Sequence, residues 1–412
     1  MYYTVFIIIT LIFVLLDWYF YRAVKVYLNK LKTPYKTVLK FGYWLVTIAT
    51  IVLMLVASSF FNTGKPAPPF IRSYVVGLIF VMAISKLIGA TFILLYDLAS
   101  LLVWSYRKIS KNKTAYDSNR RLFLKKAAVI GAGLPFVTFL YGMIRTAFDY
   151  KVRTSKIKLS NLPSSFKGLK IVQISDFHIG SFISEDPVLK VVEIINKLEA
   201  DVVVFTGDLV NELAEEALPY LQILKNVKAK MGVFSILGNH DYGDYFYQPD
   251  EIEKKEANKN LMKKIYKDIG WKLLLNEHAV LTKGDDKLVL LGVENWGDKG
   301  RFQKYGDITK AKMGTNEQDC KILLSHDPSH WEAKVLPEHK DIALTLSGHT
   351  HGMQFGIEIP GFKWSPSKYM YPQWAGLYKK AEQYIYVNRG IGFIGYPGRV
   401  GILPEITLIE LA

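Results

Sequence analysis

Two kinds of hydrophobic pattern divide the chain. Up to about residue 149 the apolar residues form four long stretches, at about 3–20, 42–61, 74–104 and 127–148. Each is near or above the length of about 20 residues with which an apolar helix crosses a hydrocarbon core. The sequence therefore predicts a bundle of about four transmembrane helices in residues 1–149.

The third stretch carries two charged residues, Lys86 and Asp97. Their spacing puts them on one helix face but about 16 Å apart along the axis, which is too far for a direct ion pair. Charged residues in membrane helices find partners on neighbouring helices, snorkel to the surface, or serve transport and proton relay. We expect structural partners here, with relay as the alternative.

From about Lys151 onward the apolar runs are short and alternate in type. Strand patterns lie within 169–180, 201–208, 232–241, 287–294, 320–328 and 342–352. Helical patterns lie within 185–200, 213–229 and 251–269. Strands that alternate with helices predict an α/β domain over residues 150–412.

The positive charge belongs to the membrane region. Residues 1–149 hold 18 Lys/Arg and 4 Asp/Glu, whereas residues 150–412 hold 34 and 33. A near-neutral C-terminal part lacks the basic surface that nucleic acid requires, so we predict no nucleic-acid binding. The single cysteine, Cys320, excludes an intrachain disulfide and argues against a cysteine metal site.

The basic residues also predict an orientation in the membrane. Six lie between the first and second apolar stretches and eight between the third and fourth, but two between the second and third. The positive-inside rule then places everything after the fourth helix outside the cytoplasm. Arg120 and Arg121 precede that helix and resemble a twin-arginine export signal, although paired arginines can also be merely topogenic. We therefore expect a multi-pass protein of the bacterial inner membrane with an extracytoplasmic C-terminal domain.

Polar residues gather where the predicted strands end. Because ligand sites of α/β sheets lie at the carboxyl ends of the strands, five distant patches can meet at one place. Imidazole, carboxylate and amide ligands without thiolate suit Mn²⁺, Fe or Zn²⁺, and the set is too large for one ion but natural for two. The candidate ligands are Asp176, His178, Asp208, Asn239, His326, His349 and His351.

These patches, in this order, resemble the calcineurin-like metallophosphoesterase superfamily. The resemblance covers residues 150–412, and the C-terminal sequence is similar to a bacterial membrane-associated branch. That branch includes twin-arginine-exported phosphoesterases and enzymes like UDP-diacylglucosamine hydrolase. The resemblance implies a four-layer αββα sandwich with two divalent metal ions, which in this chain follows a membrane bundle.

The resemblance also assigns roles to single residues. It implies that the first ion is held by Asp176, His178, Asp208 and His351, and the second by Asp208, Asn239, His326 and His349. It further implies that His240 is a catalytic histidine that faces the substrate, and that Asp241 orients it.

The predicted activity is hydrolysis of phosphate esters, with phosphodiesters or lipid- and envelope-linked phosphates as expected substrates. Two cations neutralise the phosphate and generate hydroxide between them, which attacks phosphorus, while His240 protonates the leaving oxygen. The alternative is a UDP-2,3-diacylglucosamine-type pyrophosphatase, against which the predicted orientation counts because that substrate is cytoplasmic. A non-catalytic binding module is a weaker alternative, since His240 and every ligand position are present.

Two further groups of residues are candidates for contact with the substrate. Arg389 and Arg399 lie in the glycine-rich C-terminal strands and are predicted to bind the anionic group of the substrate, with surface or backbone-capping roles as the alternative. The aromatic residues that follow His240 can form a lip for a lipid or base, or pack in the ordinary way. They are Tyr242, Tyr245, Phe246 and Tyr247.

Overall fold

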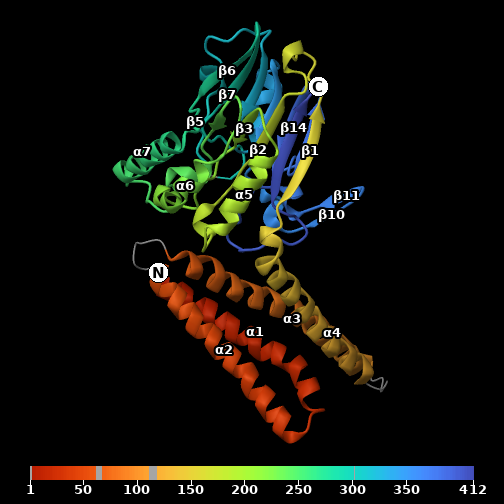
Figure 1. The fold of residues 1–412 in the computed structure, drawn as a ribbon. Helices are drawn as coiled ribbons and strands as arrows, with labels where there is room; N and C mark the ends of the chain where they lie inside the picture. The colour runs from red at the N-terminus through yellow and green to blue at the C-terminus, as the bar shows by residue number, and fades with distance from the viewer. Residues whose placement is uncertain (1, 62–66, 111–117, 301) are drawn as a thin grey trace. The chain divides into compact units, whose positions relative to one another are not determined.

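The computed structural model describes residues 2–61, 67–110, 118–300 and 302–412. The chain forms two compact units, Met1–Tyr141 and Gly142–Ala412 (Figure 1). The basic residues Lys111 and Lys113, like the side chains of Arg120 and Arg121, lie outside the described part. The predicted export signal therefore stays a prediction.

The N-terminal unit consists of long apolar helices, as the hydrophobic stretches predicted. They are α1 (Tyr2–Leu28), α2 (Thr33–Phe61), α3 (Val76–Ser110) and α4 (Ser118–Ile144), with a short π-helix at Phe70–Val75 before α3. Four segments are long and apolar enough to cross a membrane: Phe6–Leu28, Thr33–Phe60, Phe70–Ile109 and Leu122–Phe148. All four are longer than the apolar stretches alone suggested.

Lys86 and Asp97 both find partners on a neighbouring helix. Lys86 pairs with the fully buried Asp17 of α1 at 2.5 Å, and Thr47 of α2 donates to the same carboxylate at 2.5 Å. Asp97 forms a bidentate ion pair with Arg22 of α1, with Nη1–Oδ2 at 2.6 Å and Nη2–Oδ1 at 3.2 Å. These pairs favour the structural role over a relay, because each charge is neutralised where water is scarce.

The C-terminal unit contains two six-stranded sheets. The first has the order β1 (Lys151–Ile157), β14 (Glu405–Leu411), β2 (Lys170–Ile174), β3 (Val202–Phe205), β4 (Val233–Ser235), β5 (Lys272–Leu273). The second has the order β12 (Gly376–Lys380), β13 (Gln383–Val387), β9 (Ile342–Ser347), β8 (Cys320–Leu324), β7 (Asp286–Gly292), β6 (Glu277–Lys283). A separate hairpin pairs β10 (Ile357–Ile359) with β11 (Phe362–Trp364).

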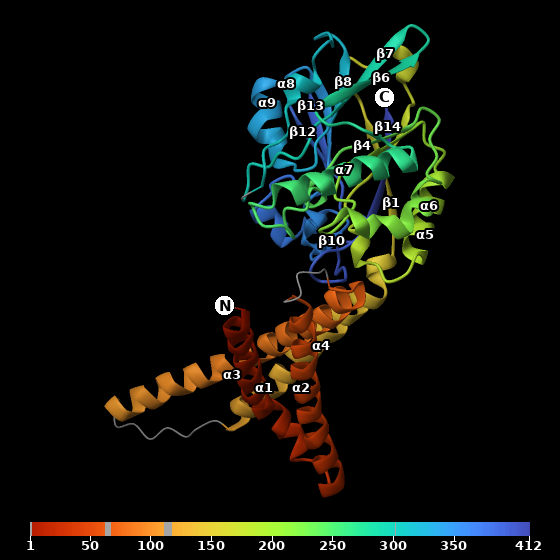
Figure 2. The same cartoon turned by 90° about the vertical axis from the view of Figure 1, so that its left-hand side faces the viewer.

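Alternating side chains pack these sheets into four layers. In β3, Val202 and Val204 face the core between the sheets, whereas Val203 and Phe205 face the helices α5 (Asp186–Lys197), α6 (Leu221–Leu224) and α7 (Ile252–Ile269). The second sheet repeats this pattern and turns its outer face toward α8 (Ile308–Ala311) and α9 (Leu336–Glu338). Figures 1 and 2 show helices on both sides of the paired sheets. The predicted αββα sandwich is confirmed.

One predicted helix is much shorter in the structure. Residues 213–229 form a 3₁₀-helix at Ala214–Tyr220 and then α6, which ends at Leu224. Pro219 lies inside this segment, and a proline lacks the N–H that an α-helix interior needs. The apolar residues of the segment are nevertheless buried as predicted, because Ala214, Ala217 and Ile223 pack in the core beneath the helices.

The central strands of both sheets run parallel, and this positions the candidate site. β2, β3 and β4 are parallel neighbours in the first sheet, and β7, β8, β9 and β13 are parallel neighbours in the second. The loops after β2, β3, β4, β8 and β9 carry all the predicted metal ligands. The carboxyl ends of five strands therefore deliver these side chains to one place.

Candidate metal centre

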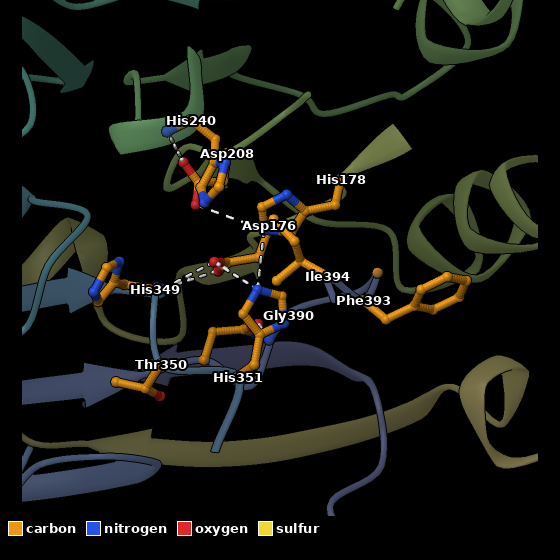
Figure 3. Close-up of polar contacts among 12 residues, drawn as sticks. Asp176, His178, Asp208, His240, His349, Thr350, His351, Gly390, Phe393 and Ile394 are labelled. Atoms are coloured by element: carbon orange, nitrogen blue, oxygen red, sulfur yellow. Dashed lines mark hydrogen bonds and ion pairs between the residues drawn. The ribbon is translucent and has the colours of Figure 1, made fainter. Parts of the chain in front are cut away.

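Six of the seven predicted ligands form two clusters. Asp176, His178 and His351 form the first, and Asp208, His326 and His349 form the second; within each cluster the ligand atoms lie within 4.8 Å of one another. Figure 3 shows the rings of His178 and His351 beside the Asp176 carboxylate, while the ring of His349 points to the other side.

Asp208 lies between the two clusters. Its Oδ2 is 3.1 Å from His326 Nε2 in its own cluster and 3.6 Å from His178 Nε2 in the other. His178 Nε2 is in turn 3.0 Å from His351 Nε2. One carboxylate therefore faces the histidines of both clusters, which is the arrangement that a bridging ligand of two metal ions requires.

The donor atoms have the environment of metal ligands. His326 donates Nδ1–H to the Thr206 carbonyl at 2.7 Å, since a carbonyl can only accept, so Nε2 is the nitrogen that faces the cluster. That buried Nε2 has no hydrogen-bond partner within the described residues and faces Asp208. A buried ring nitrogen beside a buried carboxylate fits a divalent cation once the proton on that nitrogen is displaced.

The charge states follow from burial and proximity. Burial lowers the pKa of His178 well below its usual value, so its imidazole is neutral, as a ligand must be. Burial opposes the charge on Asp208, but His326, His240 and His178 together outweigh it and hold the pKa of that carboxyl well below its usual range. Burial likewise disfavours charge on His326, yet Asp208 raises its pKa to about 10, so a metal ion would have to displace a proton there.

The backbone of the ligand loops is held in an unusual conformation. Asp176, His178, Asp208, His349 and His351 all have left-handed backbones, with φ between 44° and 72°. This region is uncommon for residues other than glycine and persists where surrounding structure enforces it, often at functional sites. Residues two apart in an extended strand point to the same face, whereas with these left-handed backbones His349 and His351 belong to different clusters.

Two glycines allow the loops to approach the carboxylates. A Cβ on Gly348 would meet Asp176 Oδ2 and Ser175 Oγ, and one on Gly238 would meet Asp208 Oδ1. The backbone N–H of His349 then donates to both oxygens of Asp176 at 3.0 Å. The absence of a side chain at these positions is therefore part of how the carboxylates are held.

Asn239 and His240 begin a short 3₁₀ turn after β4 and flank the clusters. Asn239 Oδ1 lies 2.8 Å from His349 Nδ1, so the seventh predicted ligand belongs beside the second cluster. His240 donates its backbone N–H to Asp208 Oδ1 at 2.9 Å, and its ring lies edge-on to that of His178 at 4.9 Å. Both residues are therefore positioned at the centre.

Asp241 does not orient His240, which corrects the expected partner. Its carboxylate accepts the backbone N–H groups of Gly238, Asp208 and Leu209 at 2.9 Å, and that of Val210 at 3.3 Å. It therefore ties together the loops after β3 and β4. The group next to His240 Nδ1 is the backbone carbonyl of Asn211, at 2.6 Å.

Arg389 and Arg399 lie deeper than a direct role in substrate binding suggests. Arg389 forms ion pairs with the buried Glu405 and, at 2.6 Å, with Glu358. Arg399 is fully buried, donates to the carbonyl groups of the 390–392 loop, and approaches His351 Nδ1 at 3.2 Å. Their contacts are those of residues that position the loops and His351.

The sequence reasoning missed Tyr371 and Asp327, which contact the centre, and gave Tyr245 only as part of a possible aromatic lip. Tyr371 places its hydroxyl 2.8 Å from His349 Nε2, and Asp327 Oδ2 is 3.6 Å from the same nitrogen. Tyr245 stacks on His240 with ring centroids 4.2 Å apart. Asp327 directly follows His326 and could have been flagged on that ground, whereas no sequence signal marks Tyr371, which lies far along the chain.

An αββα sandwich with two histidine and carboxylate clusters at the strand ends defines a class of metal-dependent phosphoesterases, and the sequence comparisons agree with it. Residues 169–353 match the family described as "Calcineurin-like phosphoesterase". Residues 3–147 match "Probable Calcineurin-like phosphoesterase, transmembrane domain", and this match covers the four apolar helices.

Relatives occur in bacteria and in animals. A protein of Helicobacter pylori named "Uncharacterized metallophosphoesterase" is 30% identical over 355 residues, which cover 85% of this chain and 87% of that protein. "Transmembrane protein with metallophosphoesterase domain" of Danio rerio is 31% identical over 293 residues, 69% of this chain but only 63% of the fish protein. "Uncharacterized metallophosphoesterase YkuE" of Bacillus subtilis is 28% identical, covering 71% of this chain and 97% of that one.

The chain belongs to the calcineurin-like metallophosphoesterases, which are hydrolases of phosphoric ester bonds. The matching proteins include animal ones in addition to bacterial ones. Membership of the narrower bacterial branch therefore stays a prediction.

Proposed function

We propose that this protein is a membrane-anchored phosphoesterase that uses two divalent metal ions. The observation that carries the proposal is the position of Asp208 between the clusters Asp176–His178–His351 and His326–His349. Asn239, next to His349, would complete the second site. Histidine and oxygen ligands without thiolate are compatible with Mn²⁺, Fe or Zn²⁺.

The ions would neutralise the phosphate oxygens and lower the pKa of a bound water, which are the two obstacles to hydrolysis near neutral pH. The protein residues hold this arrangement rigid. The four backbone donors to Asp241 fix the loops that carry Asp208 and Asn239. The left-handed backbones at His349 and His351 direct one ring to each cluster.

His240 would supply the proton for the leaving oxygen. A carbonyl can only accept, so the contact with Asn211 O requires that Nδ1 carries a hydrogen, which leaves Nε2 for the substrate. In its doubly protonated form the imidazole donates from Nε2 as the P–O bond breaks, while water supplies the new oxygen on phosphorus.

We further propose phosphodiesters, or phosphates linked to lipids or to the cell envelope, as substrates. Four apolar segments keep the chain at a membrane, where such substrates are concentrated. We propose that residues 150–412 form the catalytic domain and face the outside of the cytoplasm. The distribution of basic residues along 1–149 supports this orientation.

The metal proposal is tested with two variants of the full chain in detergent. Asp208→Asn should lower the bound metal, measured by elemental analysis, and abolish hydrolysis of bis-p-nitrophenyl phosphate. His240→Asn should keep the wild-type metal content but lose most turnover on esters with poor leaving groups, because it removes a proton donor worth roughly 10²–10⁴-fold. Wild-type metal content in Asp208→Asn would refute the bridging role.

The orientation is tested by cysteine accessibility. The one native cysteine, Cys320, is buried in β8, so its background labelling is low. In intact cells a membrane-impermeant maleimide should label Lys283→Cys, on the exposed end of β6, and should not label Lys30→Cys, between the first two spans. The reverse pattern would place the catalytic unit in the cytoplasm and favour the nucleotide-lipid pyrophosphatase.

A further inference from the structure

A cavity of about 660 Å³ lies beside the candidate metal centre. Asn239 and Tyr242 line it from the turn after β4, and Ile252, Lys255 and Lys259 line it from one face of α7. The loop after β7 closes it with aromatic residues. A cavity of this size suits an organic group much larger than phosphate.

Two aromatic rings connect the cavity with the metal centre. Tyr245 lines the cavity, stacks on the His240 ring, and accepts a hydrogen bond from Asn239 Nδ2 at 2.8 Å. Phe302 lines it too and meets the His349 ring edge-on, with centroids 5.0 Å apart. A group attached to an oxygen that His240 protonates would therefore extend between these two rings.

The two lysines of the cavity already have anionic partners. Lys255 pairs with Asp244 at 2.8 Å, and Lys259 pairs with Glu294 at 2.6 Å. Lys259 Nζ also lies over the rings of Tyr242 and Tyr305, 5.5 and 5.9 Å from their centroids. These paired cations are poor ligands for a second phosphate, whereas Tyr245 and Tyr305 are 49% and 42% exposed and offer aromatic surface to a ligand.

The geometry points to a substrate whose leaving group carries an aromatic or heteroaromatic ring, which this cavity binds by stacking. This inference rests on the proposed phosphoesterase function and adds the class of leaving alcohol. In the reaction the ester P–O bond breaks, water supplies the oxygen to phosphorus, and the ring-bearing alcohol leaves with a proton from His240.

The test compares two esters that differ only in the ring, 2-phenylethyl phosphate and 2-cyclohexylethyl phosphate. Their leaving alcohols have similar size and basicity, so the ratio of kcat/KM reports the preference for an aromatic ring. Full-length, metal-loaded protein should prefer the phenyl ester roughly threefold to tenfold, the range expected for one or two aromatic contacts. A ratio near one, or a preference for cyclohexyl that marks an aliphatic pocket, would overturn the inference.

Variants locate the preference in the cavity. Phe302→Leu and Tyr305→Leu should each lower the phenyl-to-cyclohexyl ratio of kcat/KM at least twofold. If one of the two variants does not fold, the other still tests the inference. Tyr369→Leu removes a highly exposed aromatic residue that does not line the cavity, so it should leave the ratio unchanged. A ratio that survives in both cavity variants contradicts the assignment.

A binding measurement separates this inference from the proposed function. The two corresponding phosphonates cannot be hydrolysed, and calorimetry with the full chain gives their Kd values directly. If no ester is hydrolysed but the phenyl phosphonate binds at least threefold more tightly, the proposed hydrolysis fails and the ring-binding cavity stands. Equal Kd values would overturn the ring-binding cavity even in an active phosphoesterase.

Discussion

Glu405→Gln tests whether Arg389 has a structural role, as the partner of a buried carboxylate, and not a role in substrate binding. Glu405 is fully buried in β14 and accepts from the Tyr386 hydroxyl at 2.6 Å, from Thr407 Oγ1 at 2.7 Å, and from the Arg389 guanidinium. The substitution keeps the size of the side chain but removes its charge. It also replaces one carboxylate oxygen by an NH₂ group, which faces a hydroxyl or guanidinium donor and cannot accept from it. Arg389 would keep only Glu358 as an anionic partner among its described ion pairs.

The expected loss is about 3 kcal/mol in the free energy of unfolding, since removal of one partner from a buried pair costs about 3–5 kcal/mol and Arg389 keeps a second carboxylate. For a unit of this size that corresponds to a fall in Tm of about 6–12 °C. Burial opposes the charge on Glu405, but Arg389 outweighs it and lowers the pKa of Glu405 below its ordinary value.

That lowered pKa gives the pH dependence a definite sign. A carboxylate with a depressed pKa in the folded state contributes stability that is fully present above its unfolded pKa of about 4.3, and this contribution disappears as the pH falls through the folded pKa. The difference between wild type and Glu405→Gln should therefore be constant from pH 6 to 8 and shrink below about pH 4.

Glu410→Gln is the matched control because Glu410 lies on the same strand. Its pair with Lys156 at 3.0 Å is largely exposed, so its loss should cost less than about 1 kcal/mol. Denaturant unfolding of the full chain in detergent, followed by tryptophan fluorescence, measures both variants. If Glu405→Gln is no more destabilising than Glu410→Gln, the buried network does not hold Arg389 and a role in substrate binding regains support.

Three further outcomes are expected. Gly348→Ala should displace Asp176, lower the metal content and destabilise the unit by about 1–3 kcal/mol, whereas Gly42→Ala, where a Cβ has free space, should change neither quantity. Lys86→Met should leave Asp17 buried without its cation and cost about 3 kcal/mol of thermal stability in detergent; an unchanged melting curve would show that the pair is not needed. Removal of metal with a chelator should lower the Tm of the wild type and restore it on addition of Mn²⁺ or Zn²⁺, because a ligand stabilises the state that binds it; an identical Tm would count against the metal centre.

Most of the architecture could be predicted from the sequence because it depends on local patterns. Apolar length predicts the membrane helices, and alternation of short strands with helices predicts the sandwich. The position of the ligands follows from one rule of topology, that parallel strands end at the same edge. For this reason His326 and Asp208, which are far apart in the chain, could be placed together. The structure brings them to 3.1 Å, while their binding of metal stays a prediction.

What the sequence could not show are contacts that no local pattern encodes. Asp17 is one polar residue in an apolar run, and only the packing of α1 against α3 reveals it as the partner of Lys86. The resemblance implied that Asp241 orients the adjacent His240, but the turn after β4 directs the two side chains to different groups. Adjacent residues in a tight turn point in different directions, so closeness in sequence is weak evidence for contact.

Arg399 illustrates why the remaining roles require the structure. Within the C-terminal unit its backbone N–H donates to the carbonyl of Gly142 at 3.2 Å, and Thr146 Oγ1 donates to its carbonyl. Its guanidinium reaches His351 Nδ1 and two carbonyls of the 390–392 loop. Burial lowers the pKa of Arg399 to about 10, so it stays charged at neutral pH, and because it has no acceptor it fixes the lone pair of Nδ1 toward itself. Nε2 of His351 then faces His178 and Asp176, so this arginine positions a predicted ligand and does not need to touch the substrate.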